Sequence, residues 1–100
     1  MKLNYKTLKI EVDDNVMYDL EYVETYARII KLQNDKSTTA QAEMLLEFKN
    51  LFSILLDEKN RDKAYKWIKK ENNGRVDVRI LADMVANIQG QLNALEAKKK

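Results

Sequence analysis

The chain has 100 residues, of which 45% are hydrophobic and 34% charged, a composition typical of one folded domain with a single modest core. It contains no proline, cysteine or histidine and only two glycines. This composition favours helices, excludes disulfides and thiolate metal sites, and removes the most versatile acid–base group. We therefore expect a protein that is not an enzyme and that has no cofactor and no metal.

Two further absences bear on location. The first ten residues lack the apolar core of a signal peptide, and no apolar run is long enough to span a membrane. We expect a cytoplasmic protein with no membrane contact. The net charge of +2 hides a segregation, because residues 13–33 sum to −3 and residues 61–79 sum to +4. Such a distribution favours association between oppositely charged surfaces.

Residues 3–12 carry the alternation of a half-buried strand. Leu8, Ile10 and Val12 alternate with charged residues, whereas Leu3 and Tyr5 alternate in the opposite parity. The change of phase at residues 6–7 indicates a tight turn or a bulge. The segment is therefore predicted to be one strand or a short β-hairpin.

A first helix is predicted from the capping residues at 13–15 to about Gln33. It carries two apolar rows about 140° apart. The first row, predicted to face the core, is Val16, Leu20, Val23, Ala27 and Ile30. The second row is Tyr18, Tyr22, Thr25, Ile29 and Leu32. This second row either packs against the N-terminal strands or forms a surface for a partner.

The second helix is the richest apolar element of the chain. Thr38 and Gln41 form a capping box, and the helix is predicted to end near Glu58. Seven large apolar side chains share one of its faces, so it should form the centre of the core. They are Met44, Leu45, Phe48, Leu51, Phe52, Leu55 and Leu56.

Two more helices complete the predicted fold. Asn60 is the expected cap of a third helix over 61–70, and Gly74 or Asn73 should close it in the left-handed conformation. Asp77 should cap a fourth helix that reaches about Ala97. We predict one domain, 1–100, with a β segment at 3–12, a helical body at 13–97 and a basic tail at 98–100. The fold class is α+β, mainly α, with four helices packed around the second.

The fourth helix also carries small residues at steps of four: Ala82, Ala86 and Gly90. They could let another helix approach closely. Alanine is also the best helix former, which explains two of the three positions without a partner. It does not explain Gly90, since a glycine within a helix costs about 1 kcal/mol against alanine.

A basic segment suggests a different function. Lys63, Lys66, Lys70 and Arg75 could contact phosphates as part of a small nucleic-acid-binding regulator, with Tyr65 and Trp67 interleaved. The other interpretation makes the lysines a solvated face and the two aromatic residues part of the core. The nearly balanced total charge favours that second interpretation, so nucleic acid is the alternative and not the leading partner.

The order of elements resembles the small tail assembly chaperone-like proteins of long-tailed bacteriophages. The resemblance lies in the β segment KLNYKTLKIEV, the F-x-x-L-F pattern of residues 48–52, the short helix DKAYKWI and the N-N-G turn. It implies a non-enzymatic viral protein of the host cytoplasm that binds and coats the tape-measure protein and helps to recruit tail-tube subunits. A homo-oligomer is the expected assembly.

These observations lead to one mechanistic hypothesis. An apolar helical partner would be shielded by Tyr18, Tyr22, Ile29 and Leu32 on the first helix, with Ala82, Ala86 and Gly90 as a second contact surface. Charge would steer the encounter. If so, polar substitutions at Tyr22 and Ile29 should weaken association without unfolding the domain.

Overall fold

The computed structural model describes residues 1–99, with only the backbone of Lys99, and begins with a β-hairpin. Strands β1 (Lys2–Tyr5) and β2 (Leu8–Glu11) pair antiparallel, with Leu3 opposite Ile10. A two-residue turn joins them, and Lys6 adopts a φ of 53° there. Because the turn places Tyr5 opposite Leu8, both apolar sets lie on one face and are buried. This explains the opposite parities in the sequence.

Both outer edges of the hairpin are covered by side-chain amides. The Nε2 of Gln91 donates to the carbonyl of Asn4 at 2.9 Å on the β1 side. On the β2 side the backbone N–H of Glu11 donates to Oδ1 of Asn60 at 3.0 Å. These bonds satisfy backbone groups that a two-stranded sheet otherwise leaves open, and so fix the hairpin to the helices.

One hydroxyl of the hairpin makes stability depend on alkaline pH. Tyr5 is buried and its hydroxyl donates to Oδ2 of Asp83 at 2.5 Å. Burial raises the pKa of Tyr5 to about 12, from a value of about 10 in the unfolded chain. The hydrogen bond to Asp83 and the negative charge of Asp83 act in the same direction. The folded state therefore holds this proton more tightly, so its contribution is complete below about pH 10 and is lost as the pH rises through about 12.

We expect the free energy of unfolding to fall more steeply above pH 10 in the wild type than in Tyr5→Phe. Urea denaturation followed by circular dichroism, repeated across that range, measures both slopes. The two proteins differ in one hydroxyl group, so the difference between the slopes isolates Tyr5. Parallel slopes would show that the Tyr5 hydroxyl is not the source.

The helical body begins with a break that the sequence did not predict. A 3-10 helix, η1 (Asp14–Tyr18), is followed by Asp19 in an extended conformation, and only then by α1 (Leu20–Gln33). The single helix predicted from the residue 13–15 cap is therefore wrong at its N-terminal end. Asp19 is the N-cap of α1, so Val16 and Tyr18 belong to a separate short helix.

The remaining helices are α2 (Thr38–Leu55), α3 (Glu58–Glu71) and α4 (Val78–Lys99). Two predicted caps move by one and three residues, because Ser37 caps α2 and Asp57 caps α3. Helix α2 ends earlier than predicted, at Leu55 rather than Glu58, since Leu56 is extended. The predicted closure of the third helix is confirmed, with Asn73 and Gly74 both at positive φ. Of the predicted basic tail, residue 100 lies outside the described residues.

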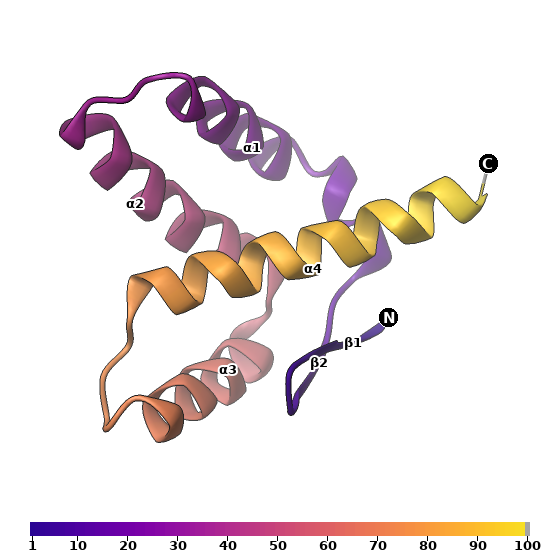
Figure 1. The fold of residues 1–100 in the computed structure, drawn as a ribbon. Helices are drawn as coiled ribbons and strands as arrows, with labels where there is room; N and C mark the ends of the chain where they lie inside the picture. The colour runs from indigo at the N-terminus through magenta and orange to yellow at the C-terminus, as the bar shows by residue number, and fades with distance from the viewer. Residues whose placement is uncertain (100) are drawn as a thin grey trace.

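Figure 1 shows α1 and α2 as an antiparallel pair and α4 as the long helix that crosses the molecule. Helix α2 packs against both α1 and α4, α4 also packs against β1, and α3 packs against β2. The rings of Phe52 and Tyr65, 5.1 Å apart, join α2 to α3. This arrangement confirms the predicted fold class: a hairpin followed by four helices, with α2 in contact with the other three.

Candidate protein-binding surface on α1 and α2

The row of α1 that the sequence offered as a partner surface lies mostly in the core. Tyr22 and Ile29 are only 5% and 2% exposed, and Thr25 between them is also buried. The hydroxyl of Tyr22 accepts a hydrogen bond of 3.0 Å from Nε2 of Gln89, a buried residue of α4. These side chains cannot meet a partner without unfolding, so the hypothesis for them is wrong.

The other row, predicted to be core, faces outward. Leu20, Val23 and Ile30 are 72%, 50% and 44% exposed, and Ala27 between them is exposed too. We call these four residues the outer row. Of the five residues predicted for that row only Val16 is buried, and it belongs to η1 rather than to α1. The two faces of α1 are therefore reversed relative to the sequence prediction.

The remaining members of the predicted partner row are more accessible. Tyr18, in η1, is exposed, but its hydroxyl donates to Oε1 of Glu96 at 2.6 Å, which ties it to α4. That hydrogen bond raises the pKa of Tyr18. Leu32 is half-buried and lines a groove between α1 and α2.

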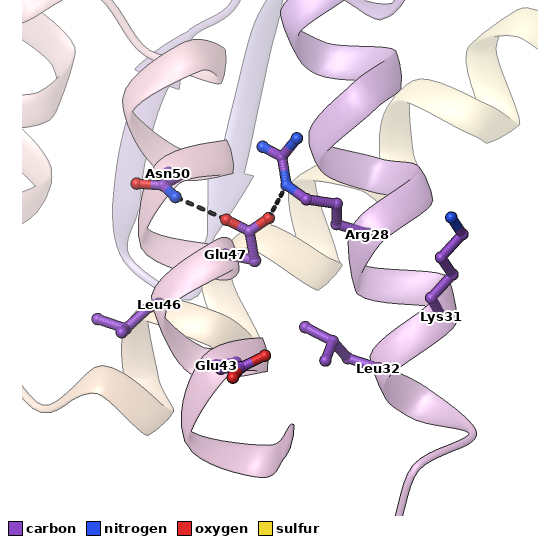
Figure 2. A pocket seen from close by; sticks show the side chains of 7 residues that line it. All are labelled: Arg28, Lys31, Leu32, Glu43, Leu46, Glu47 and Asn50. Carbon is purple, nitrogen blue, oxygen red and sulfur yellow. Dashed lines mark hydrogen bonds and ion pairs between the residues drawn. The ribbon is translucent and has the colours of Figure 1, made fainter. Parts of the chain in front are cut away.

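This groove is open, has a volume of about 440 Å³ and has a mainly apolar wall. Leu32 projects from α1 toward α2, whereas Leu46, 60% exposed, projects from the side of α2 that faces away from α1 (Figure 2). The α1 rim carries Arg28 and Lys31, and the α2 rim carries Glu43 and Glu47, with Asn50 completing the lining. The apolar wall of the groove is therefore bordered by positive charge on α1 and by negative charge on α2.

An ion pair bridges the two rims. Glu47 accepts from Nε of Arg28 and, through its other oxygen, from the amide of Asn50 at 2.7 Å (Figure 2). Burial opposes the ionisation of Glu47, but the hydrogen bonds from Arg28 and Asn50 outweigh it and lower the pKa of Glu47. Arg28 also donates to the hydroxyl of Thr25 at 3.1 Å. The groove therefore has a charged rim that is fixed in place before any partner binds.

The predicted second contact surface on α4 is open. Ala82 is half-buried, Ala86 and Gly90 are exposed, and a Cβ built on Gly90 would meet no atom within 4 Å. Nothing within residues 1–99 therefore requires glycine at position 90 for space.

The alternative phosphate-contacting residues form a solvated face. Lys63, Lys66 and Lys70 are exposed on α3, and Arg75 is exposed after the helix has ended. The interleaved aromatic residues are engaged elsewhere: Trp67 donates to the hydroxyl of Thr7 at 2.8 Å, and Tyr65 packs on Phe52. No aromatic platform for stacking a base accompanies the lysines on the described part of α3.

Within residues 1–99, no three acidic side chains gather so that they could hold a metal ion. Among the helices of the same range, none combines the length and apolarity needed to cross a lipid bilayer. A scan of protein-family models, a search of curated proteins and a search of solved structures each returned no match.

The sequence did not reveal two features of the exposed apolar surface. One is that Leu46 lines the groove, and the other is that Leu20, Val23 and Ile30 face outward. A signal for the break before α1 was present in Asp19, a residue type that favours caps and has poor helix propensity. Starting the helix there separates Val16 from the row it was assigned to.

Proposed function

We propose that this chain is a non-enzymatic protein-binding module that shields an apolar helical segment of a partner protein during assembly. The observation that carries the proposal is the groove between α1 and α2, which is lined by Leu32 and Leu46 and carries basic residues on α1 and acidic residues on α2. An amphipathic helix presents the matching chemistry, an apolar stripe with charged residues on each side, and grooves between paired helices are a recurring site for such segments.

The resemblance to phage tail assembly chaperone-like proteins suggests the partner. A tape-measure protein, held in the host cytoplasm until tail-tube subunits are recruited, would expose long apolar helical stretches that need cover. We also propose that the chain self-associates. The identity of the partner extends the proposed binding function and depends on it.

Binding of a model helix tests the proposal directly. The probe is a fluorescent amphipathic peptide of about 18 residues, five helical turns, with leucine on one face and alternating lysine and glutamate on the other. We expect micromolar affinity by fluorescence anisotropy and a loss of about tenfold or more in Leu46→Glu, because the substitution places a charge on the apolar wall. Leu46 is largely exposed, so the fold should tolerate the change.

Val76→Glu is the matched control. Val76 is also a partly exposed apolar residue, but it lies in the segment between α3 and α4, outside the groove lining. This variant should bind the peptide as the wild type does. Equal weakening in both variants would mean that the peptide adheres to any apolar surface, and an unchanged affinity in Leu46→Glu would remove the groove from the proposal. Co-expression with a phage tape-measure protein would then test the identity of the partner.

A further inference from the structure

We infer that the outer row of α1 is a homodimer interface in which α1 of one copy packs antiparallel against α1 of a second copy about a two-fold axis. The row is Leu20, Val23, Ala27 and Ile30, with successive spacings of three, four and three residues. This spacing is the seam pattern of paired helices. The row is about 15 Å long at 1.5 Å per residue, which is nearly three helical turns.

The opposite face of α1 holds the helix in place. Tyr22 and Ile29 anchor it in the core, and the rims of the adjacent groove are bridged by Arg28 and Glu47. The outer row is therefore presented on a helix that is already formed and fixed. Association then costs little additional conformational entropy, which favours a helix pair even over a short seam.

Charges beside the seam select the occupant. Glu24 and Lys31 directly follow Val23 and Ile30, so they flank the seam on the same side. Both are exposed, and neither forms an ion pair with another residue of the described chain. In an antiparallel pair equivalent flanks face each other, so Glu24 of each copy lies beside Lys31 of the other. The two-fold axis makes this pair twice.

The alternatives fit less well. A parallel pair would place Asp19 of one copy beside Glu24 of the other, bringing like charges together. A membrane surface is disfavoured because acidic residues, Glu21 and Glu24 as well as Asp19, line the N-terminal half of α1, and anionic lipid headgroups would repel them. Only the antiparallel copy supplies both an apolar seam and the complementary flank.

This inference gives a geometry to the self-association proposed above and rests on it. A seam of three turns buries little surface, so we expect a weak dimer with a dissociation constant in the micromolar range. Static light scattering or sedimentation equilibrium over a concentration series measures it. Val23→Glu with Ile30→Glu should shift the protein to monomer throughout the series, and circular dichroism verifies that the double variant stays folded.

Charge exchange tests the antiparallel arrangement separately. Glu24→Lys and Lys31→Glu should each weaken dimerisation by about fivefold to tenfold, because each turns both exposed ion pairs into repulsive pairs. The chain carrying both substitutions should recover the wild-type affinity, and so should an equimolar mixture of the two single variants. Val76→Glu, which lies outside the seam, should dimerise normally.

Three results would overturn the inference. They are a wild type that stays monomeric at millimolar concentration, a dimer that survives Val23→Glu with Ile30→Glu, and a charge exchange without recovery. Failure of the dimer inference can be distinguished from failure of the proposed function, because binding of the peptide probe depends on the groove and not on the outer row. Leu46→Glu should lose peptide and keep the dimer, whereas Val23→Glu with Ile30→Glu should lose the dimer and keep the peptide.

Discussion

Replacing Ile29 by asparagine should strongly destabilise the protein, whereas the same replacement of Ile30, its neighbour, should leave the monomer nearly as stable as the wild type. Ile29 is 2% exposed and Ile30 is 44% exposed. Removing a buried isoleucine side chain costs about 2–5 kcal/mol, and an amide without partners in its place adds roughly 1–3 kcal/mol. Since a domain of this size is stable by only about 5–15 kcal/mol, the sum of about 3–8 kcal/mol removes a large share of the free energy of unfolding.

The exposed position behaves differently because its side chain is already in contact with water. A surface substitution of this kind changes the free energy of unfolding by about 0.5 kcal/mol or less. Urea denaturation should be run at a concentration where the wild type is monomeric, so that loss of the dimer seam does not count as loss of folding. Equal destabilisation by both substitutions would contradict the assignment of the two faces of α1.

The orientation of α1 could not be obtained from its sequence. Its two rows have similar apolar content, so periodicity predicts an amphipathic helix with two candidate core faces and does not choose between them. The choice depends on tertiary partners: Gln89 of α4 meets Tyr22, and Glu47 of α2 meets Arg28. No local pattern contains those contacts, which join residues 67 and 19 positions apart.

The features that could be predicted depend on short-range chemistry. Apolar and polar residues alternate in residues 3–12 because successive side chains of a pleated strand point to opposite faces. A two-residue turn shifts this alternation by one position, so the hairpin could be predicted. Asn73 and Gly74 tolerate positive φ for local reasons, which located the end of α3. Caps were predicted less well, because several adjacent polar residues can each serve as one, as Ser37 and Thr38 illustrate.

Asn60 was expected to be a helix cap and is instead a buried connector, so its replacement by alanine should destabilise the fold. Its Oδ1 accepts from the backbone of Glu11 at 3.0 Å, and its Nδ2 donates to Oδ1 of Asp57 at 2.8 Å. Alanine would leave the N–H of Glu11 without a partner, at a cost of about 1–3 kcal/mol. Asn72→Ala, at the C-cap of the same helix, is the matched control, because the amide of Asn72 donates to the carbonyl of Ile68 within its own helix.

Asn60→Asp distinguishes the two hydrogen bonds through pH. The new carboxylate would still accept from Glu11 but would face Asp57, whose pKa is lowered by the backbone and side-chain hydrogen bonds that Asn60 now gives it. Two adjacent carboxylates raise the pKa of one of them above the ordinary value of about 3.9. Stability is therefore complete when that group is protonated and is lost as the pH rises through its raised folded-state pKa.

At neutral pH Asn60→Asp should be less stable than Asn60→Ala, and in acid the order should reverse because the protonated carboxyl regains a donor toward Asp57. Urea midpoints of the two variants and of Asn72→Ala, measured from neutral to acidic pH, would show the crossing. If Asn60→Ala cost no more than Asn72→Ala, the bond to Glu11 would not stabilise the hairpin against α3. A reversal of the two stabilities would show that residue 60 donates a hydrogen bond to Asp57. That bond holds residue 60 in place at the start of α3, where it also accepts from Glu11 at the edge of β2.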